Sequence, residues 1–294
     1  MRANAKWLVA IGCTVALPVS AQVLPSNQTN SNWFVDAQAE IAAKNAAVTN
    51  DNARNVILFV GDGMGVSTLT ASRIYAGQLN GQPGEEGLLS FESFPNTALV
   101  KVYNVNAQTP DSAGTMTAMM SGIKTDVGVI GVDEDVERGD CATVDGNEVF
   151  TYLELAEVAG MSTGIVSSAR ITHATPAATY AKSADRNWED ISDMPPEAIA
   201  AGCEDIASQL INFESNLEAR YQGIDVDGIE VAFGGGRRHF LPNDPLFNSP
   251  DAVSATEGDR TDGRDLTEEW QASYPNGAYV FDQAGFDAID ARTT

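Results

Sequence analysis

Short apolar runs alternate with longer mixed segments along the chain, and this pattern predicts an α/β fold. The clearest run is 56–60 in "RNVILFVGDGMG", which ends in a glycine-rich turn. An apolar run without alternation is typical of a strand buried on both faces, as parallel strands are. The next segment, "VSTLTASRIYAG", predicts a helix over 66–77 that stops at Gly77.

The same order recurs twice downstream. "EVFTYLELAEVAG" predicts a helix closed by Gly160, and "TGIVSS" predicts a second buried strand. A helix in "EDIASQLINFE" and a strand in "GIEVAFGGG" follow. Strands and helices in this order predict a mostly parallel central sheet with helices on both faces. Such sheets bind ligands beyond the carboxyl ends of their strands, so the residues after each strand are the candidates for chemistry.

The first residues have the pattern of a secretory signal peptide. Arg2 and Lys6 give a basic start, an apolar stretch covers 7–19, and small residues precede an expected cleavage after Ala21. The apolar stretch is too short to cross a bilayer, and no other stretch comes close. We therefore expect an exported protein, periplasmic or extracellular, without a transmembrane segment.

Three parts are expected along the chain: the signal peptide 1–21, a polar arm 22–32 and one α/β domain 33–294. The arm is short of core residues, which favours flexibility. The domain is expected to begin with an amphipathic helix at about 33–48, where apolar residues recur at multiples of seven.

Charge and cysteine content narrow the function classes. The net charge is −24, and it becomes −26 without the signal peptide, which carries two basic residues and no acidic one. Such a charge repels nucleic acids, so no nucleic-acid partner is expected. Cys141 and Cys203 remain after cleavage. An even pair in an exported protein suggests one disulfide, with two buried free thiols as the alternative.

Two candidate residues lie at turns that begin helices. Asp62 follows the first predicted strand between glycines that leave its carboxylate uncovered, as a metal ligand requires, although an ordinary Asp-Gly turn has the same sequence. Ser112, in "TPDSAGTMTAMMSG", lies where helix N–H groups and the dipole favour an alkoxide and an incoming phosphate. The alternative is that Ser112 only caps the helix.

Three more candidates follow the second strand. His173 and Thr175, in "RITHATPAATY", are placed to address a hard metal directly or through water, unless the histidine merely bonds the backbone. Arg186, in "SADRNW", offers a fork of donors that suits two phosphoryl oxygens. Its alternative is a surface ion pair with Asp185 or Glu189.

Taken together, these stretches closely resemble the N-terminal half, or somewhat more, of alkaline phosphatases, in the branch that includes the animal enzymes. The resemblance is carried in family order by "NVILFVGDGMGVST", "YNVNAQTPDSAGTMTAMMSGIKT", "GNEV", "ITHATPAATYAKSADRNW", "GCEDIASQLI" and "GGGRRHFLP". It implies hydrolysis of phosphate monoesters, with Ser112 as the nucleophile that becomes phosphoserine. Arg186 would hold the phosphoryl oxygens, and Asp111 would orient Arg186.

The resemblance also implies metal ions and a partner. Asp62 would bridge a zinc and a magnesium ion, Ser112 would lie on that zinc, Thr175 would bind the magnesium, and His173 would lie in or beside the magnesium shell. It places a disulfide between the two remaining cysteines and implies a homodimer for the full-length protein, through surfaces that include the N-terminal helix.

The chain departs from the family pattern in its histidines, of which it has only His173 and His239. Because the family takes most zinc ligands and one magnesium carboxylate from its C-terminal half, we expect a C-terminally truncated fragment that is inactive alone. Two other function classes stay open. One is a related phosphodiesterase or sulfatase, although the Cys/Ser-x-Pro-x-Arg motif of sulfatases is missing. The other is a non-catalytic phosphate- or metal-binding module.

Overall fold

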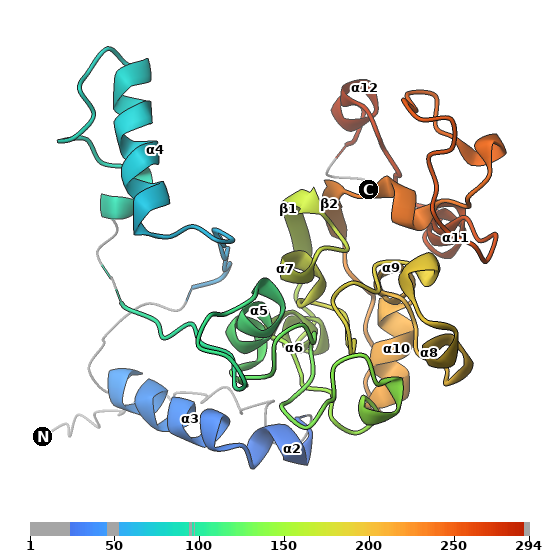
Figure 1. Ribbon diagram of the computed structural model, residues 1–294, viewed down its shortest axis with the longest axis horizontal. Helices are drawn as coiled ribbons and strands as arrows, with labels where there is room; N and C mark the ends of the chain where they lie inside the picture. Colours follow the sequence, from blue (N-terminus) through green and yellow to red (C-terminus); the bar gives the residue numbers. More distant parts are fainter. Residues whose placement is uncertain (1–23, 46–52, 94–95, 97, 291–294) are drawn as a thin grey trace, which may run out of the picture.

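The described residues form a two-stranded parallel sheet with helices around it (Figure 1). The computed structural model describes residues 24–45, 53–93, 96 and 98–290. Strand β1 (Gly164–Arg170) pairs in parallel with β2 (Val231–Gly235), and Gly164 lies opposite Val231. These are the second and third strands that the sequence predicts, and the predicted α/β class is confirmed. Their predicted burial is wrong, because Val166 and Val231 are 76% and 40% exposed and only Ile165 of the residues in these two strands is buried. The predicted signal peptide lies outside the described residues.

Helices and helical turns make up most of the remaining regular structure. None of the helices in the described ranges has the length and apolar content that crossing a membrane requires. In chain order they are α2 (Ser26–Thr29), α3 (Asn32–Asn45), α4 (Val66–Leu79), η1 (Ser90–Ser93), α5 (Ser112–Ser121), η2 (Cys141–Thr143), α6 (Tyr152–Val158), α7 (Ala174–Ala177), η3 (Ile191–Asp193), α8 (Pro196–Ala200), α9 (Ile206–Ile211), α10 (Phe213–Arg220), η4 (Arg237–Phe240), η5 (Pro245–Phe247), α11 (Leu266–Ser273) and α12 (Gln283–Asp287).

Helix boundaries follow the capping signals of the sequence. Thr151 and Glu154 form a capping box at the start of α6, and Gly160 has a φ of 68° just after its end. Asp205 caps α9 through Ser208 N. Helix α4 also forms as predicted, but it continues through Gly77 to Leu79.

The main hydrophobic core lies between α5, α6, α7, α9 and β1. Its members are Ala113, Met116, Met120, Ile130, Phe150, Leu153, Ile165, Ile171, Ala174, Ala177, Ala178, Tyr180, Ala181, Ile206, Ala207, Phe213, Leu217, Val226, Phe240 and Leu266. Lys182 is buried beside this core, where its Nζ lies 2.9 Å from Glu154 Oε2 and donates to Val149 O. The pairing matters because a buried ammonium without a partner is strongly unfavourable.

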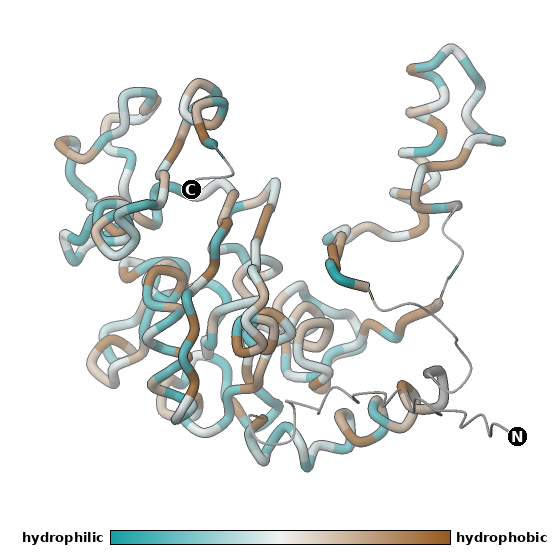
Figure 2. The backbone as a smooth tube through the Cα atoms, turned by 180° about the vertical axis from the view of Figure 1, so that it is seen from behind, coloured by the Kyte–Doolittle hydropathy of each residue, from teal (hydrophilic) through white to brown (hydrophobic). Residues whose placement is uncertain are grey.

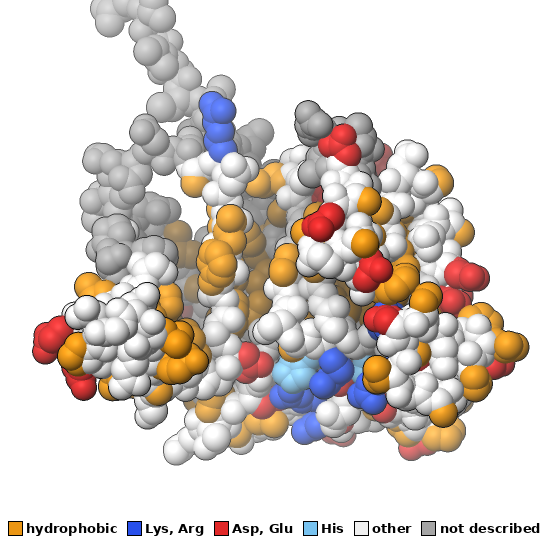
Figure 3. Space-filling model, turned by 90° about the horizontal axis from the view of Figure 1, so that it is seen from above, with side chains coloured by type: hydrophobic (Ala, Val, Ile, Leu, Met, Phe, Trp, Pro, Cys, Tyr) orange, Lys and Arg blue, Asp and Glu red, His pale blue; other side chains and the backbone are white. Residues whose placement is uncertain are grey.

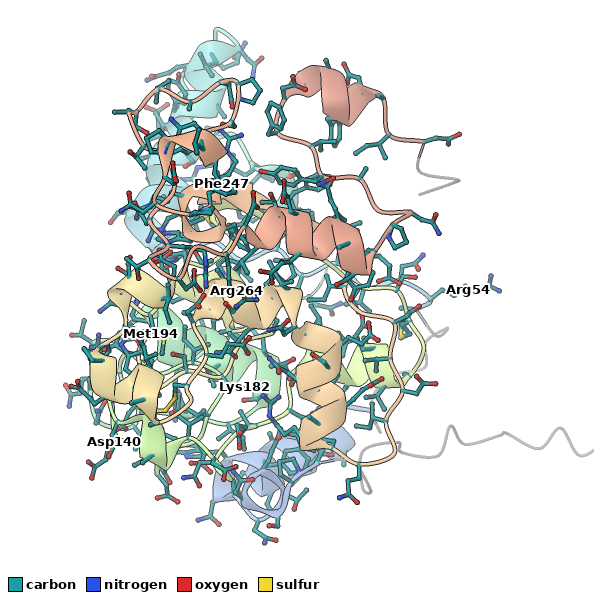
Figure 4. All side chains as sticks on the ribbon, turned by 90° about the vertical axis from the view of Figure 1, so that its right-hand side faces the viewer. Arg54, Asp140, Lys182, Met194, Phe247 and Arg264 are labelled. Carbon is teal, nitrogen blue, oxygen red and sulfur yellow. A yellow bond between two sulfur atoms is a disulfide. The ribbon has the colours of Figure 1, made fainter. Side chains whose placement is uncertain are left out.

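A second, smaller core surrounds the cysteines. Cys141 and Cys203 form a disulfide, visible as the yellow bond in Figure 4, with Cα atoms 5.9 Å apart. Both pack against a cluster that includes Val129, Val144 and Trp188. The disulfide that the family resemblance implies is confirmed.

The polar arm is attached to the body over part of its length, in contrast to the expected flexibility. Helix α2 lies within it, and Gln28 is fully buried. The Gln28 amide donates to Ser121 O and accepts from Phe150 N, at 2.9 and 2.7 Å. One glutamine thus supplies backbone groups of the core with partners, which hydropathy alone does not reveal. Helix α3 confirms the predicted N-terminal helix as far as Asn45.

The prediction of a buried strand at 56–60 is wrong for this structure. Val56, Ile57, Leu58 and Phe59 are 59–87% exposed, and no described strand pairs with them. An apolar run becomes a buried strand only where neighbours pair with its edges and cover its faces, and none of the described segments does so here. Figure 2 shows the hydrophobic run along the chain before α4, and Figure 1 shows α4 standing apart from the body.

Candidate active site

The N-terminus of α5 places Asp111 and Ser112 side by side with different roles. Asp111 is the capping residue, since its Oδ1 accepts a hydrogen bond from Gly114 N at 3.0 Å. Ser112 is the first helical residue, and its Oγ donates to Asp62 Oδ1 at 2.8 Å instead of capping the helix. The alternative of a purely capping Ser112 is therefore wrong.

Asp62 joins two segments that are far apart in the sequence. Its Oδ2 accepts a hydrogen bond from Thr175 Oγ1 at 2.8 Å, while its Oδ1 faces Ser112. The glycine-rich turn allows this exposure of the carboxylate, since Gly63 has a φ of 64°. The Asp-Gly turn is thus present, and its carboxylate also makes long-range contacts.

His173 lies beside Asp62 at the start of α7. Its Nδ1 lies 3.9 Å from Asp62 Oδ2 and is buried without a hydrogen-bond partner. Its Nε2 lies 3.2 Å from an Arg186 nitrogen. The alternative of a histidine side chain bonded only to the backbone does not describe this ring.

Arg186 contacts both Asp111 and His173, and so joins the N-terminus of α5 to the start of α7. Its NH1 donates to Asp111 Oδ2 at 3.1 Å, and Gly128 N donates to the same oxygen. Asn104 Nδ2 donates to Asp111 Oδ1 at 2.8 Å. The proposed surface pairs of Arg186 are absent, because Asp185 pairs with Arg138 and Glu189 with Arg170.

Asn104 and Gly128 support the site but were not predicted. Asn104 lies in the quoted stretch "YNVNAQTPDSAG", yet nothing in its local pattern distinguishes it from a loop asparagine. Gly128 contributes only backbone groups, since its N–H donates to Asp111 and its carbonyl oxygen accepts from Arg186 N. Both contacts arise from tertiary approach, which residue spacing does not encode.

The electrostatic environment keeps Asp62 ionised and His173 neutral near neutral pH. Burial raises the pKa of Asp62, but the hydrogen bonds from Thr175 and Ser112 outweigh it and lower the pKa overall. Burial and the nearby Arg186 and Arg170 guanidinium groups lower the pKa of His173. The Asp62 carboxylate, the neutral His173 imidazole and the Ser112 and Thr175 hydroxyls therefore lie close together. These are groups that bind divalent cations.

All of the predicted site residues lie in one place. Three chain segments contribute them, namely the turn before α4, the start of α5 and the region from α7 to Arg186. Figure 3 shows histidine and basic side chains gathered on one face, with acidic side chains near them. The arrangement combines an oriented hydroxyl, an anion-binding guanidinium and a helix N-terminus.

Known proteins with similar sequences are alkaline phosphatases. The chain is 43% identical over 257 residues to human tissue-nonspecific alkaline phosphatase, covering 86% of this chain and 47% of that protein. It is 44% identical over 238 residues to an alkaline phosphatase of Gadus morhua, covering 80% of this chain and 47% of that one. The chain thus spans about half the length of these relatives.

A solved structure supports the fold. The crystal structure of a cold-active alkaline phosphatase from a psychrophilic Shewanella sp. matches with a TM-score of 0.50 at 23% identity, over 78% of this chain and 42% of that one. The sequence model of the family, described as alkaline phosphatase, matches residues 53–291. The chain belongs to the alkaline phosphatase family.

Proposed function

We propose that this chain carries the nucleophile half of an alkaline phosphatase site, which hydrolyses phosphate monoesters through a phosphoserine at Ser112. One observation carries the proposal: Ser112 Oγ, at the start of α5, is oriented by Asp62 while Arg186 lies beside the same helix terminus. A hydroxyl at a helix N-terminus next to an arginine is placed both to bind a phosphoryl group and to attack it.

The residues present fit zinc and magnesium. Asp62 offers both oxygens, and the buried His173 Nδ1 has no hydrogen-bond partner, which is the condition of a nitrogen available to a ligand. Asp62 and Ser112 would hold zinc, while Asp62 and Thr175, with His173 in or beside that shell, would hold magnesium. Bound divalent cations would offset the charge of the phosphoryl oxygens and favour the alkoxide form of Ser112.

Each residue then has a defined part in the reaction. Ser112 Oγ loses its proton to solvent and attacks phosphorus, the bond to the leaving oxygen breaks as the Oγ–P bond forms, and the leaving alkoxide takes up a proton from solvent and departs as an alcohol. Arg186 holds phosphoryl oxygens in line with the α5 terminus, and Asp111 fixes its guanidinium. Water then attacks the phosphoserine, which releases inorganic phosphate and restores the Ser112 hydroxyl.

Export and dimerisation belong to the same proposal. The Cys141–Cys203 disulfide supports an oxidising compartment, periplasmic or extracellular. Helix α3 exposes Val35 and Ile41, which supports an intermolecular contact in a homodimer of the full-length protein.

Single-turnover labelling tests the proposal. The full-length protein that contains this chain is mixed with an aryl phosphate in the presence of zinc and magnesium, and the peptide containing Ser112 is analysed by mass spectrometry. We expect phosphoserine at Ser112, no label in Ser112→Ala, and normal labelling in Ser215→Ala, which removes an exposed hydroxyl of α10. Phosphate binding without phosphoserine would instead support a binding module, and faster cleavage of a diester or sulfate ester would support a related hydrolase.

A further inference from the structure

A second group of potential metal ligands lies away from the candidate active site. Asp190 precedes η3, His239 belongs to η4, and Asp259 lies in the loop between η5 and α11. One ligand atom from each residue lies within 4.8 Å of the others. None of these residues takes part in the contacts of Ser112, Asp62, Thr175 or Arg186.

The backbone holds the three side chains together. Asp259 N donates to Arg238 O, and Arg260 N donates to Leu241 O, so the segment around Asp259 runs along η4. Arg260 is buried and donates to His239 O and to Asp205. The positions of the imidazole and of Asp259 are therefore fixed by a buried network, as a preorganised site requires.

The imidazole of His239 lies between two carboxylates. Its Nδ1 lies 2.5 Å from Asp190 Oδ2, on the side of the group, and its Nε2 lies 3.2 Å from Glu189 Oε2 on the opposite side. Glu189 is itself held by Arg170 and Thr172. Histidines that bind metals commonly orient the ring through a carboxylate at the second nitrogen, and Glu189 Oε2 lies on that side of the ring, where Nε2 is buried and makes no hydrogen bond.

Burial and access are also suitable. Asp190 and His239 are 0% and 2% exposed, whereas the Asp259 side chain is 37% exposed and pairs with Arg238 at 3.0 Å. The group is thus dry on two sides and open at Asp259, which leaves a route for an ion and a place for water in its shell.

We infer that Asp190, His239 and Asp259 bind a divalent transition-metal ion of the zinc type, at a site separate from the candidate active site. One imidazole nitrogen and two carboxylate oxygens are ligands that suit zinc better than calcium or magnesium, which prefer oxygen alone. The ion ties η3, η4 and the loop before Arg260 together. A protonated His239 could also balance the charge of these carboxylates. The experiment must therefore distinguish a bound metal ion from a proton on the imidazole.

Nitrogen NMR of the histidine rings tests the site directly, because the sequence contains only two histidines. The full chain carries Asp62→Asn to weaken zinc binding at the candidate active site, and His173→Gln assigns the signals. We expect one equivalent of zinc to shift the His239 ring nitrogens, and a chelator to reverse the shift. Unchanged His239 signals would show that a proton is the only occupant and would overturn the inference.

A matched pair of variants provides the second measurement. Asp259→Asn is expected to weaken zinc binding at least tenfold in calorimetry, whereas Asp251→Asn leaves it unchanged. Asp251 is the suitable control because it is partly exposed and pairs with Arg237 as Asp259 pairs with Arg238. Equal affinities of the two variants would overturn the inference. Neither measurement depends on phosphorylation of Ser112, so the two proposals fail independently.

Discussion

Asp111 uses its two carboxylate oxygens for different purposes. Oδ1 caps α5 and accepts from Asn104, while Oδ2 accepts from Gly128 N and Arg186. Either Asp111 or Ser112 could cap the N-terminus of α5, and one side chain is sufficient for the cap. Because Asp111 takes the cap, the Ser112 hydroxyl is available to Asp62.

Removing this carboxylate should affect both stability and anion binding. Asp111→Ala loses the cap, which costs about 1 kcal/mol, and leaves neighbouring donors without an acceptor, which costs about 1–3 kcal/mol more. We also expect phosphate affinity to fall about tenfold, the equivalent of 1.4 kcal/mol, since Arg186 loses its partner. Urea unfolding and calorimetry with inorganic phosphate measure the two effects.

Asp265→Ala is the control for this change, because Asp265 caps α11 without contacting Arg186. It should lose only the cap, about 1 kcal/mol, and retain phosphate affinity. Equal losses of affinity in the two variants would show that capping alone explains the effect.

Glu157 is a buried acid with an unusual proton affinity. Burial raises its pKa from 4.5 to about 7, with help from Glu230 and Asp227, although Thr163 Oγ1 donates to it. The folded chain therefore keeps a proton that the unfolded chain loses above its own pKa. Protonation of Glu157 therefore stabilises the folded chain fully below pH 4.5. This stabilisation is lost progressively between pH 4.5 and about pH 7, and the free energy of unfolding does not change further with this group at higher pH.

Glu157→Gln should remove the pH dependence that this residue causes. When the pH is raised from 4.5 to 8, we expect the unfolding free energy of the variant to increase relative to that of the parent by up to about 3 kcal/mol. This value follows from 1.36 kcal/mol per unit of pKa shift. Urea unfolding at both pH values measures the gain. Glu197→Gln, at an exposed position of α8, should show no such change. A gain for Glu157→Gln that is equal at both pH values would contradict the assignment.

At the scale of elements, helices were more predictable than strands. Caps and glycines are local signals, so α6 and α9 begin where Thr151 and Asp205 indicate. The strand at 56–60 depended on partners elsewhere in the chain, and hydropathy carries no information about which segments will cover it. The failure at this strand is therefore a failure of tertiary context.

The candidate site was predictable for a different reason. Each of its residues has an ordinary local alternative, and only the joint resemblance to a family placed them together. The hydrogen bonds of Asp62 to Ser112 and Thr175 confirm that the residues lie close, while their chemical roles stay predictions. Asn104 and Glu189 escaped correct assignment because their partners, Asp111 and Arg170, are set by packing between elements.

Helix α5 packs so closely on its neighbours that a methyl group should disturb the site. A Cβ at Gly114 would lie 2.3 Å from Asn104 Nδ2 and 2.8 Å from Asp126 O. Alanine usually stabilises a helix interior by about 0.5–1 kcal/mol relative to glycine. Here we expect Gly114→Ala to destabilise by about 1–3 kcal/mol, since the contact forces side chains and backbone apart.

A double-mutant cycle identifies the cause of this effect. Asn104→Ala removes the atom closest to the new methyl group, so Gly114→Ala should cost less in that background than in the parent chain. Urea unfolding of the parent, the two single variants and the double variant gives the interaction free energy between the two positions. Strict additivity would show that Asn104 is not the residue displaced.

The whole molecule places many of its few basic residues in specific interior or semi-buried pairs. Lys182 pairs with Glu154, Arg260 with Asp205 and Arg186 with Asp111. With 17 basic residues against 41 acidic ones, few positive charges remain to balance the exposed carboxylates. The surface therefore repels itself, and this repulsion is weaker in an expanded unfolded chain.

Salt should consequently stabilise the protein. Raising NaCl from about 10 mM to about 500 mM shortens the Debye length from about 30 Å to below 8 Å, which screens exposed charges more than buried pairs. We expect the urea midpoint to rise with NaCl and to rise equally with KCl, because the effect is non-specific. Arg54→Glu changes an exposed side chain that points away from the body (Figure 4) and makes the net charge more negative by two. Its midpoint should depend more steeply on salt than that of the parent; a midpoint that falls with salt would mean that exposed ion pairs outweigh the repulsion.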